Sequence, residues 1–201
     1  MGREVTIKKP VKKVAIGHFV VSEMMKLLGA ENRIVAVDQR TTTDTLLYPE
    51  ISRLPVIQSA DMHYEGINYE KIFELRPDIF VTAAFVGQGF EDILAKLEPE
   101  IPVVALGVDD MESILDSVKL LASILGEEER AEEYYAFCDA SMGTIANKVA
   151  EVPEEDKPRV YFEFVPYMTF NDDCPVFADL IAQAGGINIA ADMSQQWGVG
   201  N

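Results

Sequence analysis

Residues 68–82 read NYEKIFELRPDIFVT, and this stretch decides the fold class. Asn68 predicts the start of a helix over residues 69–75, because its side-chain oxygen can accept a hydrogen bond from the first helical turn. Pro77 predicts the end of that helix, since the residue before a proline avoids helical backbone. Residues 78–82 then form an apolar run typical of a buried strand. A helix followed at once by a buried strand is half of a β-α-β unit.

The same rhythm extends to both sides of this stretch. We expect further strands at residues 14–16, 33–37 and 103–106, further helices at residues 22–29 and 90–97, and a loop over residues 38–50. Strands and helices that alternate at this spacing indicate a parallel sheet with helices on both faces. Such sheets bind ligands beyond the carboxyl ends of their strands. The candidate site loops are therefore residues 17–21, 38–44, 59–66 and 83–89.

The pattern changes after residue 108. Two helices are predicted next, at residues 110–125 and 127–151, followed by a charged linker, a strand at 159–164, a helix at 176–184 and a strand at 187–190. We therefore predict an N-terminal α/β lobe (1–108), a helical segment with a long connecting helix (109–157) and the start of a second α/β lobe (158–201). One strand-helix-strand unit is too little for a stable sheet, so we expect the second lobe to be incomplete in this chain.

Composition excludes several classes of protein. The 201 residues include 34 acidic and 17 basic ones, for a net charge of -17, which argues against nucleic acid and anionic membranes as partners. The sequence has no apolar run near the roughly 20 residues of a membrane helix. Its two cysteines, Cys138 and Cys174, make neither a disulfide framework nor a metal site, and we expect Cys138 in the core.

The sequence lacks the common catalytic motifs. It contains no GxxxxGK[ST] phosphate loop, no GxGxxG after a strand and no GxSxG elbow. We therefore expect a chain that is not an enzyme, with no catalytic residue and no resident cofactor. His18 and His63 are not spaced as metal ligands, yet both fall on candidate site loops, so each is either solvated or directed toward a ligand.

Aromatic residues are the more informative feature of these loops. Those expected outside regular elements are Phe19, Tyr64, Phe85, Tyr167, Phe170 and Trp197. They are either loop anchors or two aromatic walls that face a cleft. Arg40 stands beside three threonines, Thr41 to Thr43, and is either an exposed surface arginine or the counter-charge of an anionic ligand.

Short motifs follow one another in a specific order along the chain. They are GREVTI (2–7), LLGA (27–30), NYEKI (68–72), LRPD (75–78), IPVV (101–104), LGE (125–127) and AGGINI (184–189). In this order the chain resembles the extracytoplasmic solute-binding proteins of iron-siderophore, haem and vitamin B12 ABC importers, from residue 2 to residue 197. The most specific match is NYEKI with LRPD, where the family reads Asn-Leu-Glu-x-Ile and then Leu-Lys-Pro-Asp before an apolar strand.

The resemblance implies two Rossmann-like parallel-sheet lobes, joined by a long helix, that hold a ligand between them. It implies that Glu70 is the glutamate that docks on arginines of the permease dimer, whereas Glu70 taken alone reads as a first-turn partner of the helix dipole. Tyr64 and Trp197 match aromatic positions of the vitamin B12-binding members, and Phe85 lies near a third. Arg40 replaces an aromatic residue of those members, which favours an anionic chelate or an oxyanion.

These observations lead to one expected function and several alternatives. We expect an extracytoplasmic solute-binding subunit of an ABC importer, for a metal chelate such as a ferric siderophore, haem or a corrinoid. The expected ligand-binding residues are His18, Phe19, Arg40, Tyr64, Phe85, Tyr167 and Trp197. The alternatives are a molybdate- or tungstate-binding member of the same family, an enzyme on a nitrogenase-like two-lobe fold, and an interaction module built on the acidic helix at 127–151.

The resemblance also carries expectations about the ends of the chain and its partners. We expect truncation at both ends, with the signal sequence absent, and a location in the periplasm or anchored on the outer face of the membrane. A second copy of the chain is a further candidate partner: a homodimer could form through the unfinished second lobe, since unpaired strand edges invite pairing.

Overall fold

The computed structural model describes residues 3–59, 66–84, 90–165, 168–169 and 175–193. The chain divides into two compact units. Unit 1 comprises Met1–Val108 and Ile114–Glu132, and unit 2 comprises Asp109–Ser113 and Glu133–Asn201.

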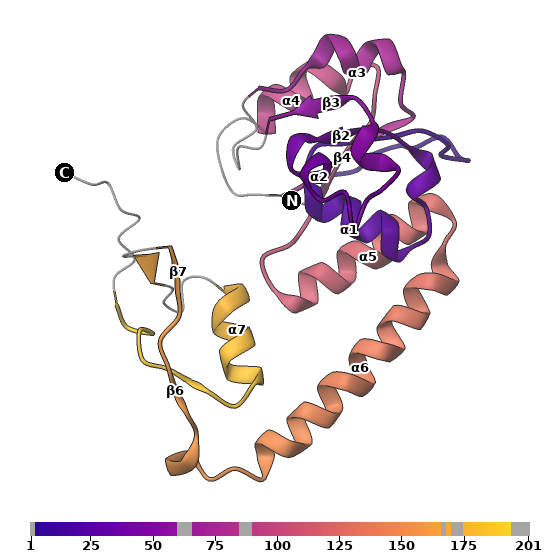
Figure 1. Cartoon of the computed structure of the whole chain (residues 1–201). Helices are drawn as coiled ribbons and strands as arrows, with labels where there is room; N and C mark the ends of the chain where they lie inside the picture. The colour runs from indigo at the N-terminus through magenta and orange to yellow at the C-terminus, as the bar shows by residue number, and fades with distance from the viewer. Residues whose placement is uncertain (1–2, 60–65, 85–89, 166–167, 170–174, 194–201) are drawn as a thin grey trace, which may run out of the picture. The chain divides into compact units, whose positions relative to one another are not determined.

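A five-stranded parallel sheet forms the centre of unit 1 (Figure 1), with the strand order β3-β2-β1-β4-β5. Its strands are β1 (Val14–Ile16), β2 (Ile34–Asp38), β3 (Val56–Gln58), β4 (Ile79–Ala83) and β5 (Val103–Leu106). The prediction of a parallel sheet is confirmed, and four of these strands lie within a residue or so of their predicted positions. Strand β3 was not predicted: its residues, VIQ, are not an apolar run like the VAI of β1, and its pairing with β2 defines it.

Helices cover both faces of this sheet. Their bounds are α1 (Phe19–Leu27), α2 (Gln39–Thr43), α3 (Tyr69–Leu75), α4 (Phe90–Leu97) and α5 (Met111–Leu125), with 3-10 turns η1 (Glu31–Arg33) and η2 (Ile51–Arg53). Helices α3 and α4 lie on one face of the sheet and α1 and α5 on the other (Figure 1). Helices α3 and α4 occupy their predicted residues.

Two local predictions were wrong, and for the same reason. Helix α1 begins at Phe19, not at Ser22, because the side chain of His18 caps it. Residues 39–43, expected within a loop, form the short helix α2 because Asp38 caps them. In both cases a side chain accepts the backbone N–H groups that the first turn leaves unpaired.

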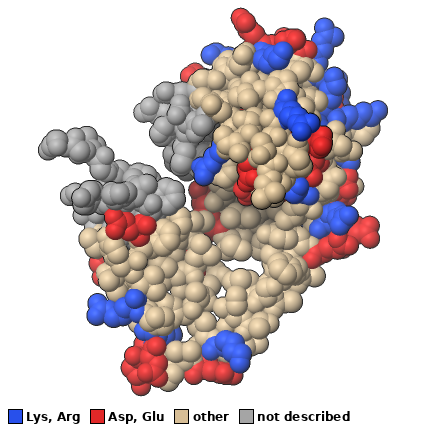
Figure 2. Space-filling model, viewed as in Figure 1, with Lys and Arg blue, Asp and Glu red and all other residues tan. Residues whose placement is uncertain are grey.

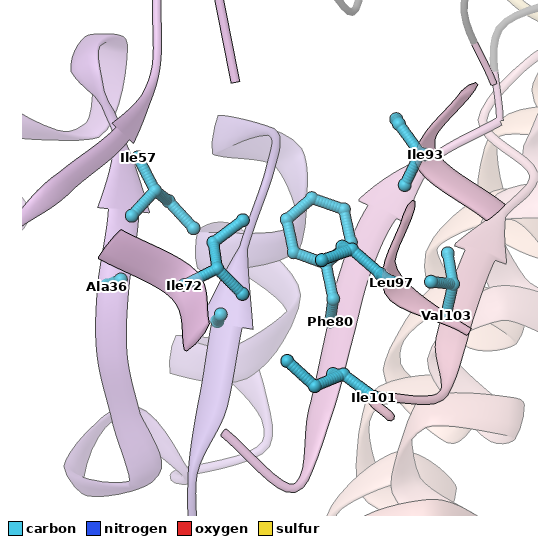
Figure 3. Packing of buried hydrophobic residues seen from close by; sticks show 9 residues of the cluster. Ala36, Ile57, Ile72, Phe80, Ile93, Leu97, Ile101 and Val103 are labelled. Carbon is cyan, nitrogen blue, oxygen red and sulfur yellow. The ribbon is translucent and has the colours of Figure 1, made fainter. Parts of the chain in front are cut away.

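One hydrophobic cluster of unit 1 lies between the sheet and helices α3 and α4 (Figure 3), and buried residues of α1 and α5 add to the core on the other face. Phe80 on β4 is fully buried at the centre of this cluster, with Ile72 of α3 and Leu97 of α4 beside it. Burial of one such side chain stabilises a fold by about 1.5–3 kcal/mol. This packing holds α3 and α4 against the sheet.

The N-terminal segment follows the amino edge of the same sheet. The N–H groups of Lys12 and Lys13 donate to the carboxylate of Asp78, just before β4, at 2.7 and 2.8 Å. The guanidinium of Arg3 pairs with Glu98 and donates to the carbonyl of Val103, the first residue of β5. Residues 3–13 are thereby held at the edge opposite to the carboxyl ends of the strands.

A long helix follows α5. Helix α6 (Glu128–Ala150) lies close to its predicted span, and its first residues belong to unit 1 and the others to unit 2. The guanidinium of Arg33 donates to the carbonyl of Leu125 at 2.6 Å and pairs with Glu127. These contacts fix the junction between α5 and α6. Cys138 on α6 is buried, as predicted.

Unit 2 contains a β-α-β arrangement. Strands β6 (Arg159–Val160) and β9 (Ile187–Asn188) pair in parallel, and α7 (Pro175–Gln183) lies between them in sequence. The predicted strand at 159–164 is instead two short strands, because β7 (Glu163–Val165) turns back to pair antiparallel with β8 (Met168–Thr169). The 3-10 turn η3 (Glu154–Asp156) precedes β6, and the rings of Phe162 and Phe177 stack at 4.6 Å.

Candidate functional site

The carboxyl ends of β1 and β2 meet at one edge of the sheet, since the two strands are parallel neighbours. His18 follows β1 after a single glycine, and Asp38 is the last residue of β2. Each of these residues caps the helix that comes next. Two helices therefore start side by side at this edge, and the residues of their first turns form the candidate site.

His18 is held as a neutral imidazole. Its Nδ1 accepts the N–H of Val20 at 3.4 Å, which places the ring proton on Nε2. Burial lowers the pKa of His18 from 6.5 to about 4. The nearby carboxylate of Asp38 opposes this change, and the positive charge of Arg40 adds to it. At neutral pH His18 is therefore an uncharged donor and cap.

A buried chain of hydrogen bonds joins the two helices. The Asp38 carboxylate accepts the N–H groups of Arg40 and Thr41 at 2.8 and 3.2 Å and the Thr41 hydroxyl at 2.6 Å. Ser22 of α1 lies 2.9 Å from the same hydroxyl. Because the only proton of the Thr41 hydroxyl goes to the carboxylate, the Ser22 hydroxyl is the donor to Thr41. All three side chains are buried.

Above this chain, an aromatic side chain and an arginine are in contact. The guanidinium carbon of Arg40 lies 4.2 Å from the ring centroid of Phe19. The rings of Phe19 and His18 are 4.5 Å apart, with an angle of 37° between their planes. Such a cation–π contact favours one orientation of the guanidinium.

Glu23 interacts electrostatically with Arg40, and Tyr48 lies within the electrostatic reach of Glu23. Burial raises the pKa of Glu23 on α1, and the charge of Arg40 opposes that change. Tyr48 is 3% exposed, and burial raises its pKa, to which the carboxylates of Glu23 and Asp44 add. Arg40 is exposed, and the carboxylate of Glu23 is an acidic group within its electrostatic reach.

Glu70 lies in the first turn of α3, which Asn68 caps by accepting the N–H of Lys71 at 3.0 Å. Glu70 is exposed and makes no ion pair with any residue that the structure describes. Glu74, on the same helix, pairs with Lys71 at 2.9 Å. Of the two carboxylates on α3, that of Glu70 is thus the one without an ion pair to a described residue.

The structure brings together three of the predicted ligand-binding residues: His18, Phe19 and Arg40. Phe19 and Arg40 lie in helices α1 and α2, not in loops as predicted. The other predicted residues, namely Tyr64, Phe85, Tyr167 and Trp197, lie outside the described residues, as do His63, Phe170 and Cys174. Sequence reasoning missed Ser22, Asp38 and Tyr48, although Asp38 with Thr41 three residues later is a capping signal.

The described parts of the chain show neither a continuous basic patch on the face in view in Figure 2 nor a cluster of metal-ligating side chains. Figure 2 shows basic and acidic side chains interspersed over the face of unit 1 in view, without one continuous basic patch among the described residues. In the described parts of the chain, no three His, Cys, Asp or Glu side chains gather as metal ligands. Over the same ranges, none of the helices has the length and apolarity that a membrane span requires.

Solved structures with the same fold come from several bacteria. The Haemophilus influenzae molybdate periplasmic binding protein MolA, bound to molybdate, has a TM-score of 0.79 at 18% identity, over 96% of this chain and 65% of that one. The Roseiflexus periplasmic haem-binding protein RhuT has a TM-score of 0.72 at 20% identity, over 92% of this chain and 68% of that one. Helicobacter pylori CeuE with bound Ni(II) has a TM-score of 0.73 at 19% identity, over 94% of this chain and 60% of that one.

The chain therefore spans about 60–68% of the length of these three structures. At such identities the likeness shows the fold alone. No curated protein matches the sequence. The model of the family described as periplasmic binding protein matches residues 14–200. These residues include the five-stranded sheet of unit 1, helix α6 and the β-α-β arrangement of unit 2. With that match over almost its whole length, this chain belongs to the periplasmic binding protein family.

Proposed function

We propose that this chain is the solute-binding subunit of an ABC importer, which captures its solute outside the cytoplasm and delivers it to a membrane permease. The family match over residues 14–200 carries this proposal. The family is one of binding proteins, and it therefore favours binding over the enzyme alternative. Its periplasmic character supports an extracytoplasmic location.

The ligand class that we assign is a metal chelate, such as a ferric siderophore, haem or a corrinoid. The names of two structures with the same fold support a ligand that contains a metal, because RhuT is a haem-binding protein and CeuE was solved with Ni(II). The first-lobe contacts that we assign to the ligand come from His18, Phe19 and Arg40, at the carboxyl edge of the parallel sheet. We assign further contacts to Tyr64, Phe85, Tyr167 and Trp197.

Molybdate or tungstate is the second candidate ligand. The structure of MolA with molybdate covers 96% of this chain at a TM-score of 0.79. Arg40 favours an oxyanion, because it makes no ion pair within the part of the chain that the structure describes, and a guanidinium donates to oxyanions in a planar fork.

Binding can be tested with the single tryptophan, Trp197, as the reporter. Its fluorescence is followed during titration with a ferric siderophore, haemin, cobalamin, molybdate and tungstate. Free tryptophan is titrated in parallel, because haem and corrins absorb the emitted light. Calorimetry on the same samples detects binding that leaves the tryptophan unchanged. Saturable binding of one probe supports the proposal, and no binding of any probe by either method contradicts the ligand classes named here.

The permease is the proposed protein partner, with Glu70 as the docking residue of the first lobe. An exposed carboxylate without an ion pair among the described residues supports this role, since pairing with a cation then requires no internal bond to break. The homodimer stays a prediction, which the molar mass from light scattering will test.

A further inference from the structure

The side chain of Arg40 has less conformational freedom than its exposure to solvent implies. Its guanidinium carbon lies 4.2 Å from the centroid of Phe19, and Phe19 is itself in contact with the ring of His18 at 4.5 Å. The guanidinium is therefore supported on one side by an aromatic ring. A long, flexible side chain normally loses rotamer entropy when it binds a ligand, and a supported one loses less.

The backbone of Arg40 is fixed as well. Its N–H donates to Asp38 at 2.8 Å, and its carbonyl accepts the hydroxyl of Thr43 at 2.7 Å. Asp38 is held in turn by Thr41, which is bonded to Ser22 on α1. Phe19 is the first residue of α1, and Arg40 lies in α2. The buried hydrogen bonds between the two helices therefore set the distance between the Phe19 ring and the Arg40 side chain.

The charge of Arg40 is not cancelled by direct contact. Among the described residues no carboxylate lies within ion-pair distance of its guanidinium. The Asp38 carboxylate takes its hydrogen bonds from backbone and from Thr41. In a chain with a net charge of -17, the edge of the sheet thus holds a cation whose N–H groups are not committed to a described carboxylate.

We propose that Phe19 is a positioning residue, which holds Arg40 so that its N–H edge receives an anionic oxygen group of the ligand. The inference rests on the proposed function and narrows it to solutes that carry such a group: an oxyanion, the carboxylates of a siderophore or the propionates of haem. A guanidinium supported on one face donates through its edge, and two parallel N–H groups match two oxygens of one anionic group.

The positioning itself is tested without a ligand, by NMR of the Arg40 side chain. In the wild type, the ring current of Phe19 shifts the Arg40 side-chain protons upfield from the values of a free arginine. Phe19→Leu removes that shift, and Phe19→Tyr restores it, because tyrosine keeps the ring. Free-arginine shifts in the wild type, or shifts that persist in Phe19→Leu, would overturn the positioning role.

The role in binding is tested by calorimetry with molybdate, haemin, ferric citrate and cobalamin as probes. For an anionic probe that the wild type binds, Arg40→Gln weakens binding about tenfold or more and flattens its dependence on salt. Phe19→Leu weakens binding about threefold, and Phe19→Tyr recovers most of that loss. Arg53→Gln removes the same charge from an exposed position in η2 of the same unit and serves as the matched control, with affinity expected within about twofold of the wild type.

The outcomes separate this inference from the proposed function. If the wild type binds an anionic probe and Arg40→Gln binds it equally well, the inference fails and the proposed function stands. If the wild type binds cobalamin alone, the binding function stands and the anionic ligand class is wrong. If it binds none of the probes, the ligand classes of the proposed function are contradicted, while the NMR result still decides whether Phe19 positions Arg40.

Discussion

The ring of Phe80 fills the space that a side chain at Gly17 would need: a Cβ at Gly17 would stand 2.5 Å from Cζ of Phe80. Phe80 is fully buried, so its ring could give way only by a shift inside the core. Gly17 joins β1 to His18, so a fully packed core lies directly beneath the start of the candidate site.

Gly17→Ala should therefore destabilise the protein, by about 1–3 kcal/mol, because the added methyl group overpacks the core. Gly143→Ala is the matched control. Gly143 lies in helix α6 with nothing within 4 Å of an added Cβ, so the same substitution should stabilise by about 0.5–1 kcal/mol. Urea unfolding of both variants measures the difference. Equal effects of the two substitutions would show that the contact with Phe80 is not limiting.

Two threonines should respond in opposite ways to replacement by valine. The Thr41 hydroxyl bridges Asp38 and Ser22, whereas the buried Thr82 hydroxyl has no hydrogen-bond partner among the described residues. Thr41→Val should cost about 1–3 kcal/mol, because it leaves buried polar groups unpaired. Thr82→Val should be neutral or stabilise by up to about 1 kcal/mol, since it removes an unsatisfied group.

A double-mutant cycle tests whether Ser22 and Thr41 act as one unit. Ser22→Ala combined with Thr41→Val should destabilise by less than the sum of the single substitutions, because the two hydroxyls share a bond. The free energies of unfolding of the four proteins give the coupling. Strict additivity would mean that the bond between α1 and α2 contributes nothing measurable.

His18 should make stability depend on pH below neutrality. Its pKa is about 4 in the folded protein and 6.5 in the unfolded chain, so the unfolded chain binds the proton more tightly. The contribution is fully present above pH 6.5 and is lost as the pH falls toward 4. Because His18 is only half-buried, the loss should be about 1–2 kcal/mol after solvent screening.

The matched variant for this measurement is His18→Asn, since asparagine also caps helices and does not titrate. Carboxylates titrate in the same range in both proteins, so the informative quantity is the difference between their stability curves. The difference in the free energy of unfolding between the wild type and His18→Asn should change between pH 6.5 and 4. Parallel curves over that range would contradict the assignment.

Glu23 should oppose the binding of an anionic probe, because its carboxylate lies within the electrostatic reach of Arg40. Glu23→Gln should tighten such binding about three- to tenfold at low salt, and less at high salt. Glu31→Gln is the control, since Glu31 is paired with Lys26 at 3.3 Å. Calorimetric titration with the same probe measures both variants, and an unchanged or weaker affinity in Glu23→Gln would count against the prediction.

Glu70 should matter for docking and not for solute binding. Glu70→Gln should leave solute affinity within about twofold of the wild type and weaken association with the permease about tenfold, through the loss of a charge-assisted contact. Glu74→Gln removes an acid from the same helix that is already paired with Lys71, so it should have a much smaller effect. Co-sedimentation with permease in proteoliposomes makes the comparison. Equal effects of the two variants would remove Glu70 from the docking surface.

The sequence was most informative where a capping residue or a proline marks the end of a helix or strand. Asn68 and Pro77 predicted both ends of α3, and the apolar run after Pro77 predicted β4. Helix α2 escaped prediction because its residues, QRTTT, have no apolar face, and its start is set by the buried carboxylate of Asp38. Strand β3 escaped because its pairing with β2, and not its own three residues, defines it.

The site was predictable in outline only. Topology alone placed His18, Phe19 and Arg40 at one edge of the sheet, because parallel strands end together. The hydrogen bond between Ser22 and Thr41 could not be predicted from the sequence, since it depends on the register of β1 with β2 and on where each helix begins. The stacking of Arg40 on Phe19 depends on the same two features.

The path of residues 3–13 along the amino edge has a practical use. Arg3, Lys12 and Lys13 are secured at the side of unit 1 opposite to His18, Arg40 and the first turn of α3. A biotin or affinity tag placed ahead of Arg3 would therefore attach the protein to a sensor chip by the side opposite to the candidate site. Such an immobilised chain would present the edge that carries His18 and Arg40 to the flow, which suits it to a sensor measurement of the proposed solute binding.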